Sequence, residues 1–225
     1  SSNLTIEIRK ANLRGVAIDK TVGRAKGPIT VLDLTVEEDV AFLSEFIRQE
    51  ADNICLIHFA PPCGTCSAAR KRRLAPAVLD RLASDGITPP QVLRSEAFPM
   101  GLPNLRGLDA MKVQLANQLY WATNRLVKLA LSLNIMVSIE NPTNSLFWKT
   151  DPMIDLFKVC PRCMNNFHSC MMGGERDKQT AWWCNDEFFN SFNLACTKDH
   201  THKACTPSIT ADGVYYPTKE EAEYP

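Results

Sequence analysis

The sequence predicts an α/β fold, in which the strands of an open, doubly wound and mostly parallel sheet alternate with helices. Two observations lead to this prediction. Short apolar segments of strand length alternate with stretches of helical periodicity from residue 4 to residue 140. Polar or reactive side chains also follow four of these segments, at the sheet edge where α/β proteins gather their ligands. The length of 225 residues fits one domain, or one domain with a small annex.

The N-terminal elements follow from the spacing of their apolar residues. Residues 4–13 favour a short helix that ends at Gly15, and residues 15–19 and 29–34 favour short strands with an acid near the end of each. Residues 35–38, Thr-Val-Glu-Glu, have the pattern of a capping box at the start of a helix. The apolar residues of that helix recur at helical spacing: Val40, Leu43, Phe46 and Ile47.

The next elements surround a long irregular segment. Residues 54–60 are almost wholly apolar, which predicts a strand buried on both faces of a parallel sheet. Residues 61–105 contain many proline, glycine and arginine residues without one clear period, so we expect a long insertion there. A long helix over 108–133 and a buried strand over 134–140, which ends in an acid, complete the predicted core.

Composition and charge narrow the classes of function. The 25 basic and 25 acidic residues balance, so any contact with nucleic acid must come from a local basic patch. No apolar run approaches the ~18 residues of a membrane helix, and no signal peptide opens the chain. We therefore expect no membrane partner. The nine cysteines are interpreted as thiols of a reducing compartment, some of them available to a metal.

Four polar or reactive residues stand at the ends of predicted strands: Asp19, Asp33, Cys63 and Glu140. Because the carboxyl ends of parallel strands meet at one edge of a sheet, we expect these side chains to share a ligand site. For the two aspartates the alternative is that each caps the helix that follows it.

Cys63 lies in the strongest local motif, Pro61-Pro62-Cys63-Gly64. The two prolines restrict the chain as it leaves a buried strand, and Gly64 lets a substrate approach the backbone closely. The basic run 70–73 follows, and positive charge nearby favours a thiolate nucleophile. The alternatives are a structural cysteine in a tight turn and, for the basic run, a solvated face.

A second motif, Glu140-Asn141-Pro142, ends the last predicted strand. A carboxyl group held beside a cysteine at the mouth of a sheet can have a raised pKa and donate a proton. Pro142 ends the strand, and the alternative interpretation of the motif is a helix N-terminus.

Together these segments resemble the cytosine-5 DNA methyltransferase family, and most closely its divergent domains in eukaryotic mobile elements. Pro62-Cys63 matches the family's cysteine motif, and Ser67 and Arg70 follow in a similar pattern. Glu140-Asn141-Pro142 is similar to the family's Glu-Asn-Val motif, with proline in place of valine. Residues 172–178 resemble its arginine motif, which keeps Arg176 and has Lys178 in place of a second arginine.

The resemblance implies a Rossmann-like methyltransferase sheet that binds S-adenosyl-L-methionine. Asp19 would bind the ribose and Asp33 the adenine, while Pro62 and Asn117 complete the implied cofactor site. The family's first motif would precede Leu4 and its last would follow the final residue, so we expect a fragment without the first strand.

The resemblance also implies a reaction and a partner. Cys63 would add to a cytosine flipped out of DNA, Glu140 would donate a proton to the ring, and Arg176 would hold the base. The implied substrate-binding residues are Ser67, Arg70, Asn141 and Lys178. A nuclear location is expected if the source is eukaryotic, and otherwise an intracellular one. The alternatives are a non-catalytic nucleic-acid-binding remnant and an RNA cytosine methyltransferase.

Three regions are expected along the chain. Residues 1–183 would form the catalytic core, residues 184–217 a small Cys/His-rich target-recognition region, and residues 218–225 the start of a return to the core.

The last third of the chain also contains the spacing of a metal site. Cys160 and Cys163 form a Cys-x2-Cys pair, which typically supplies half of a tetrahedral zinc site. The other ligands are expected to be two of four residues further along: Cys196, His200, His202 and Cys205. The alternative is that these are buried cysteines and polar loop histidines.

Overall fold

The structure is a computed structural model that describes residues 3–22, 27–161 and 164–217. The segment 218–225, predicted to return to the core, and Cys163 lie outside the described residues. The helices are α1 (Asn3–Lys10), α2 (Glu37–Gln49), α3 (Pro76–Ser84), α4 (Gly107–Ser132) and α5 (Asp151–Val159). The strands are β1 (Ala17–Asp19), β2 (Ile29–Val31), β3 (Leu56–Phe59), β4 (Met136–Pro142), β5 (Met164–His168), β6 (Gln179–Cys184), β7 (Ser208–Thr210) and β8 (Gly213–Tyr215). Short 3₁₀ turns lie at Ala51–Asn53, Ala68–Lys71, Leu146–Lys149, Ser169–Met172 and Glu187–Phe192.

The strands form one mixed sheet and two smaller ones. In the larger sheet the order is β3-β4-β6-β5, with β3 and β4 parallel and the other pairs antiparallel. β1 and β2 pair in parallel by themselves, and β7 and β8 form an antiparallel hairpin. The predicted α/β class is confirmed, but the larger sheet is mixed rather than mostly parallel. One continuous doubly wound sheet is not observed, because no strand pairing within the described residues joins β1 or β2 to β3.

The strand β3 is less buried than its sequence predicts. Its four residues, Leu56–Phe59, are all half-buried, whereas three residues of the neighbouring strand β4 in succession are buried. The reason is that β3 pairs only with β4 among the described strands and therefore lies at the edge of its sheet. An apolar run does not distinguish an edge strand from a central one.

The helix α2 begins as predicted, but its capping differs. Three acids in the first turn complement the positive end of the helix dipole, and Val40, Leu43 and Ile47 are buried. The expected capping box does not form: Val36 is the N-cap, without a side-chain cap hydrogen bond. The Thr35 hydroxyl instead donates to Asp33 Oδ1 at 2.7 Å.

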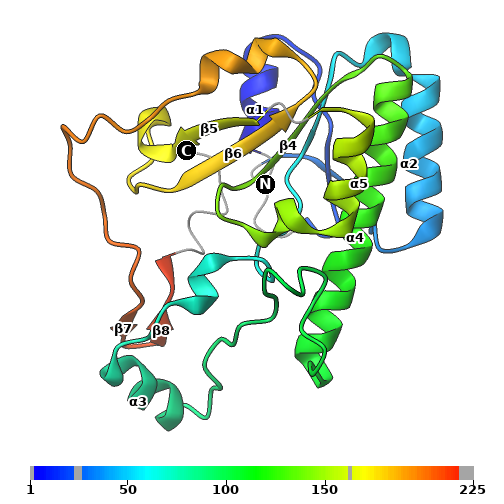
Figure 1. Ribbon diagram of the computed structural model, residues 1–225. Coiled ribbons are helices and arrows are strands. Elements are labelled where there is room, and N and C mark those ends of the chain that lie inside the picture. The colour runs from blue at the N-terminus through cyan, green and yellow to red at the C-terminus, as the bar shows by residue number, and fades with distance from the viewer. Residues whose placement is uncertain (1–2, 23–26, 162–163, 218–225) are drawn as a thin grey trace.

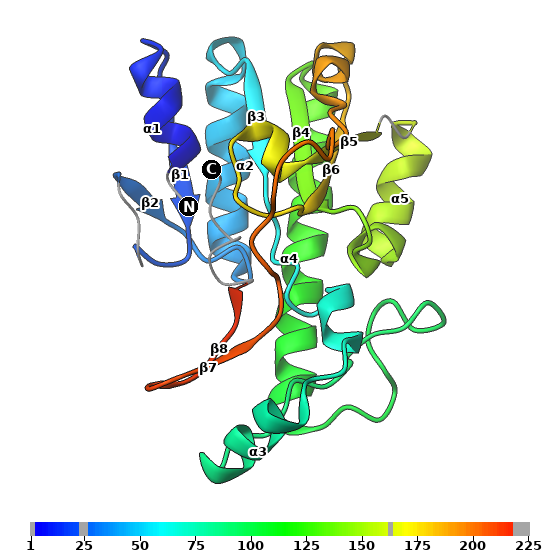
Figure 2. The ribbon, with the colours of Figure 1, turned by 90° about the vertical axis from the view of Figure 1, so that its left-hand side faces the viewer.

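The core lies between the large sheet and the helices α2, α4 and α5. The helix α4 packs against β4, with α2 and α5 on either side of it (Figures 1 and 2). Tyr120, Leu126 and Val127 of α4 are fully buried and face this core. Although α4 has 26 residues, no helix of the described ranges is long and apolar enough to cross a membrane.

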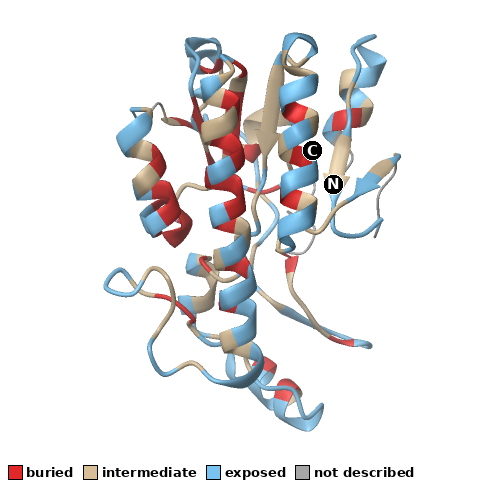
Figure 3. Cartoon of the chain, turned by 90° about the vertical axis from the view of Figure 1, so that its right-hand side faces the viewer, coloured by how far each residue is buried: buried red, intermediate tan, exposed pale blue. Residues whose placement is uncertain are grey.

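The insertion after β3 forms the lower part of the molecule. It contains α3, which packs against the β7–β8 hairpin from the C-terminal region (Figure 1). Arg81 Nη2 donates a hydrogen bond to the Ala211 carbonyl at 3.3 Å across this contact. Figure 3 shows that burial is concentrated in the helices around the large sheet, whereas α3 and the hairpin are mostly exposed.

Candidate functional site: a thiol–carboxyl pair and a Cys/His cluster

The parallel pairing of β3 and β4 brings the two sequence motifs together. Phe59 of β3 lies opposite Ile139 of β4, so the next residues along both strands reach the same edge of the sheet. Cys63 follows β3 by four residues, and Glu140 is the residue directly after Ile139. The sequence prediction that this edge gathers a thiol and a carboxyl group agrees with this register.

The turn that carries the thiol, residues 61–66, is here called the Cys63 turn. Tyr120 of α4 donates its hydroxyl hydrogen to the Pro62 carbonyl at 2.7 Å. The Asn141 side-chain amide donates to the Pro61 carbonyl at 2.9 Å. A hydrogen bond from the Cys66 amide to the Cys63 carbonyl, 2.9 Å, closes the turn. The backbone of the Cys63 turn is therefore held from α4 and from β4 at once.

A buried arginine fixes the far side of the Cys63 turn. Arg94 is only 1% exposed, and its Nε donates to the Thr65 hydroxyl at 3.1 Å. Its Nη1 donates to the Pro99 carbonyl at 2.7 Å and to Asn117 Oδ1 at 2.8 Å. The guanidinium also lies 5.4 Å from the centre of the Tyr120 ring, within range of a cation–π interaction. Arg94 therefore ties the turn to α4.

The electrostatics of the pair disfavour the thiolate that the basic run 70–73 was expected to favour. Burial raises the pKa of the Cys63 thiol, and the negative charge of Glu140 raises it further, while Lys178 opposes the shift. Burial likewise raises the pKa of the Glu140 carboxyl, again against Lys178. Lys178 Nζ lies 3.9 Å from Glu140 Oε1. A proton that leaves either group has the other as a nearby acceptor.

The two basic residues of the arginine motif take different positions. Arg176 is buried, and its Nε donates to the Ala204 carbonyl at 3.2 Å, away from the sheet edge. Lys178, two residues on, is the basic side chain that faces Glu140. The structure thus brings together Cys63, Glu140 and Lys178, and places the side chain of Arg176 against the loop that contains Ala204.

The remaining predicted substrate residues contact the Cys63 turn or lie beside it. Ser67 Oγ accepts a hydrogen bond from the Ala69 amide at 3.2 Å. Arg70 Nε donates to the Gly64 carbonyl at 2.6 Å. A cavity of about 440 Å³ opens beside these residues. Four basic side chains line it: Arg70, Lys71, Arg94 and Lys149.

Asn141 has one polar atom that is unused in the described structure. The side chain is fully buried, and no hydrogen-bond partner among the described residues reaches its Oδ1. A buried acceptor without a donor is costly, on the order of 1–3 kcal/mol. This atom is therefore available to a donor that enters the site, beside Glu140.

The four predicted cofactor residues do not gather at one place, and two of them lie at the ends of β1 and β2. Asp33 forms an ion pair with Lys20 at 2.6 Å, and hydrogen bonds from Lys20 and Thr35 lower the pKa of Asp33 to about 2. Asp19 is exposed and accepts from the Thr21 amide at 3.4 Å. Two carboxylates therefore lie at the ends of β1 and β2, and Lys20 neutralises the one on Asp33.

A second cavity, of about 580 Å³, lies between α2 and the first half of α4. Its lining begins at Leu34, directly after Asp33, and includes Asn117 and Trp121. Asp19 and Pro62 do not line it. Of the four predicted cofactor residues, the structure thus brings Asp33 and Asn117 close to one cavity.

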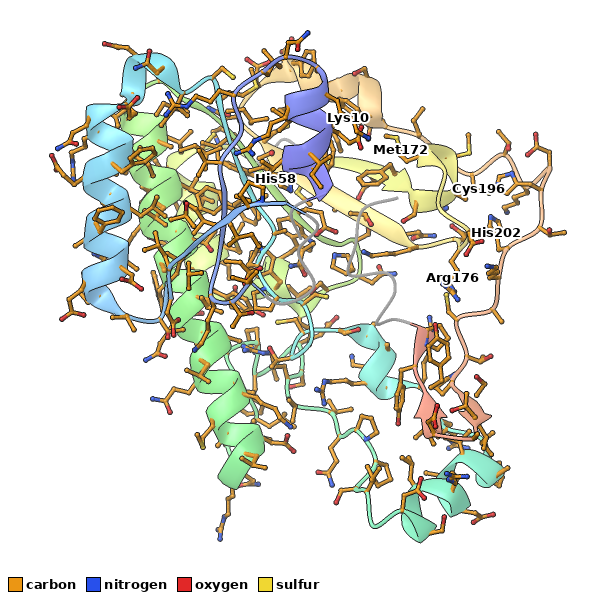
Figure 4. The ribbon with its side chains drawn as sticks, turned by 180° about the vertical axis from the view of Figure 1, so that it is seen from behind. Lys10, His58, Met172, Arg176, Cys196 and His202 are labelled. Atoms are coloured by element: carbon orange, nitrogen blue, oxygen red, sulfur yellow. The ribbon has the colours of Figure 1, made fainter. Side chains whose placement is uncertain are left out.

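The Cys/His cluster, defined as Cys170, Cys196, His200 and His202, lies at the opposite end of β5 and β6 from the helix α5. The four ligand atoms all lie within 4.8 Å of one another. Cys196 Sγ lies 3.7 Å from His200 Nε2 and 3.5 Å from His202 Nε2. Figure 4 shows Cys196 and His202 side by side, with Arg176 just below them. This Cys2His2 group could hold a metal such as zinc.

The cluster takes three ligands from the predicted group of four later residues, and its fourth ligand, Cys170, was not predicted. Among the described residues, Cys160 and Cys205 are not part of it, and Cys170 takes their place. Cys160 ends α5 before β5, and Cys170 follows β5, so the five residues of the strand separate them by roughly 16 Å. The predicted pair of Cys160 and Cys163 is not tested, because Cys163 lies outside the described residues. No disulfide bond joins two cysteines of the described ranges.

Sequence reasoning missed Cys170, Tyr120 and Arg94. Cys170 carries a weak signal, because it precedes a Cys-x3-His-x-His run by 26 positions. Tyr120 and Arg94 were missed because their hydrogen bonds to the Pro62 and Pro99 carbonyls depend on tertiary contacts that no local spacing records.

Comparison of the chain with family models, with curated proteins and with solved structures finds no match. The fold and the two sites define a mixed α/β protein with a thiol–carboxyl pair at the edge of its sheet and a Cys2His2 group near its C-terminal end.

Proposed function

We propose that this protein transfers a methyl group from S-adenosyl-L-methionine to carbon 5 of cytosine in DNA, through a covalent adduct on Cys63. The observation that carries the proposal is the meeting of Cys63 and Glu140 at the ends of two adjacent parallel strands. A nucleophile and a proton donor side by side are what this reaction requires. Lys178 beside Glu140 adds a positive charge where a negative charge develops.

The reaction begins with a proton transfer inside the pair. The Cys63 sulfur forms a bond to carbon 6 of the ring, and its proton passes to Glu140. Glu140 donates that proton to the ring nitrogen beside the carbonyl, so the electron pair of the carbon 5–carbon 6 double bond is directed onto carbon 5. Burial raises the pKa values of both groups, which favours the thiol and the carboxylic acid over their charged forms.

The second half of the reaction restores the enzyme. When bound, S-adenosyl-L-methionine would supply the methyl group to carbon 5 and would leave as S-adenosyl-L-homocysteine. Loss of the carbon 5 proton to a base, with cleavage of the bond between sulfur and carbon 6, then returns the Cys63 thiolate and releases 5-methylcytosine. The Cys63 turn must hold the sulfur in place throughout, which the bonds from Tyr120 and Asn141 support.

The cavity between α2 and α4 fits the proposed cofactor in size and chemistry. Its volume of about 580 Å³ is typical of a small-molecule site. Asp33 directly precedes its lining, and the amide of Gln118 and the ring of Trp121 line it, while the amide of Asn117 is bonded to Arg94 and to the Met100 carbonyl. A carboxylate, an amide and an aromatic ring are groups that bind an adenosyl moiety by hydrogen bonds and stacking.

The smaller cavity fits the proposed nucleic-acid partner. Arg70 and Lys71 supply positive charge beside the Cys63 turn on a chain without net charge, whereas Arg94 is buried and Lys149 is paired with Glu96, which also lines the cavity. Phosphate contacts by such residues position the strand, and the target base must leave the stack to reach Cys63. RNA offers the same phosphates, so both nucleic acids belong in the test.

A second candidate is a nucleic-acid-binding domain without turnover. Two contacts favour it: Arg176 is bonded to Ala204, and the Asp33 carboxylate is paired with Lys20. Both residues would need to exchange these partners to serve a base and an adenine.

The test measures transfer of a labelled methyl group from S-adenosyl-L-methionine to cytosine-containing DNA and RNA. Wild-type protein is expected to label DNA, and Cys63→Ser to reduce labelling to background while it still binds DNA. Cys55→Ser is the matched control, because Cys55 is an exposed thiol at the opposite end of β3 from Cys63. This variant is expected to retain activity. Binding without transfer by the wild type would favour the second candidate, and transfer to RNA alone would change the substrate.

A further inference from the structure

The spacing of the Cys/His cluster matches the edges of a zinc tetrahedron. Zinc bonds of ~2.3 Å to sulfur and ~2.05 Å to nitrogen give ligand separations of about 3.6 Å between sulfur and nitrogen and about 3.3 Å between two nitrogens. The observed separations are 3.7 and 3.5 Å from Cys196 Sγ to the two histidines, and 3.1 Å between His200 Nε2 and His202 Nε2. Cys170 Sγ completes the group within 4.8 Å.

The neighbours of the cluster orient its ligands. Asp199 Oδ1 lies 2.8 Å from His200 Nδ1, so that nitrogen carries the proton and Nε2 presents its lone pair to the cluster. The Lys198 amide donates to Cys196 Sγ at 3.3 Å, a contact that supports a sulfur with negative charge. An outer carboxylate on a histidine and an amide on a cysteine sulfur are the second contacts that metal ligands commonly have.

The segment that supplies three of the ligands, residues 195–205, buries little of its surface. None of residues 195–205 is buried, and they form no helix or strand. Such a segment cannot offset the entropy of ordering by burial of apolar surface. Four bonds to a metal can do so, because the free energy of metal binding contributes directly to folding.

The cluster borders the segment 173–178, which carries both basic residues of the arginine motif. On one side, Ser169 precedes Cys170, and its amide and hydroxyl donate to the Lys178 carbonyl at 2.9 and 3.1 Å. On the other side, the Lys203 amide donates to the Glu175 carbonyl at 2.9 Å. The Ala204 carbonyl accepts from Arg176, as described above. The segment is therefore enclosed between two ligand-bearing stretches.

We propose that Cys170, Cys196, His200 and His202 bind one Zn²⁺, and that this structural ion fixes the segment 173–178 so that Lys178 stays against Glu140. Two thiolates and two imidazoles suit zinc above other common divalent ions. With four protein ligands the coordination is complete, which makes the ion structural. The proposal stands on residues outside the Cys63 turn and does not depend on methyl transfer.

The first experiment is metal analysis of the purified full chain, with variants. Wild-type protein is expected to contain about one zinc per chain, and Cys196→Ser to lose it. Cys205→Ser is the matched control, because Cys205 is in the same loop and outside the cluster, and Cys160→Ser is the second control. Both controls are expected to keep the metal. Wild-type protein without zinc after growth with added zinc, or loss of zinc from the controls alone, would overturn the proposal.

The second experiment needs no variant, so it remains decisive if Cys196→Ser does not fold. Thiols of the wild type are alkylated with and without a chelator and mapped by mass spectrometry. Chelation is expected to increase labelling of Cys170 and Cys196 and to leave the exposed Cys55 unchanged. Equal labelling of Cys170 and Cys196 in both conditions would contradict a bound metal.

Amide hydrogen exchange on the same samples tests the effect on the segment. The amides of Gly174 and Lys203 donate to Ser169 and Glu175, both at 2.9 Å, and chelation is expected to increase their exchange strongly. The amides of β4 are expected to keep their protection. Unchanged exchange at Gly174 and Lys203 would show that the ion does not fix the segment.

Discussion

Cys63 and Cys170 both follow a strand of the same sheet, but the chain holds their surroundings in different ways. The Cys63 turn is bonded to α4 through Tyr120 and Arg94, and to β4 through Asn141. These elements pack in the main core, so the turn is fixed by the protein alone. The Cys/His cluster joins an exposed loop to the end of β5. The comparison teaches that burial orders one site, whereas we propose that a metal orders the other.

The comparison predicts that disturbing the buried bonds costs global stability. Arg94→Met would leave the Thr65 hydroxyl, the Pro99 carbonyl and Asn117 without their donor. The expected loss is on the order of 3 kcal/mol in the free energy of unfolding, measured by urea denaturation. Arg125→Met is the matched control: its ion pair with Glu37 is exposed, and exposed ion pairs contribute little to stability. Similar losses of stability in both variants would contradict the claim that buried bonds hold the Cys63 turn.

The second prediction concerns the close contact beside Cys170. A Cβ at Gly174 would lie 2.8 Å from the Ser169 carbonyl oxygen, which is backbone and must shift. Gly174→Ala is expected to cost about 1–3 kcal/mol and to weaken metal retention, since Ser169 adjoins Cys170. Gly64→Ala is the control, because nothing lies within 4 Å of its added Cβ. Full metal retention in Gly174→Ala would show that metal binding by the cluster does not depend on the segment 173–178.

The third prediction isolates one bond of the Cys63 turn. Tyr120→Phe keeps the buried ring but removes the hydroxyl that donates to the Pro62 carbonyl. A loss of about 1 kcal/mol is expected from urea denaturation, together with lower methyl transfer and unchanged metal content. A change in metal content would mean that the two sites are not held independently.

The smallest effect is expected from the charge of Glu140. Burial raises its folded-state pKa above the ordinary 4.5, so the folded state favours the protonated form. The resulting penalty is absent at pH values below the unfolded pKa, grows as the pH rises through the folded pKa, and is complete above it. Glu140→Gln should therefore be more stable than the wild type at neutral pH and equal to it near pH 3, as measured by thermal unfolding. Lower stability of the variant at pH 7 would mean that the Lys178 pair outweighs desolvation.

The sequence predicts the positions of helices and strands better than it predicts which strands pair with one another. The helix expected over 108–133 is α4, and the strand over 134–140 is β4, because apolar periodicity records which face of a segment is buried. Whether an apolar run is a central or an edge strand depends on pairing, so the burial of β3 was predicted wrongly. The predicted capping box of α2 does not form for a local reason, because the Thr35 hydroxyl is hydrogen-bonded to Asp33.

The candidate sites divide in the same way. Cys63 and Glu140 were predicted because each follows its own strand, and the parallel register of β3 and β4 brings them to one edge. Cys196, His200 and His202 were predicted because they are close in sequence. Cys170 was not, because the direction of β5, which spacing does not record, decides which cysteine reaches the loop.

The central claim is that Cys63 is the nucleophile, and covalent trapping tests it most directly. The full chain is incubated with S-adenosyl-L-methionine and DNA that contains 5-fluorocytosine. After methyl transfer, fluorine at carbon 5 leaves no proton to remove, so elimination stops and the bond between sulfur and carbon 6 persists. Mass spectrometry of the digested adduct is expected to find the nucleotide on Cys63 alone. An adduct on Cys66, or methyl transfer to ordinary DNA without any adduct on the fluorinated DNA, would contradict the account.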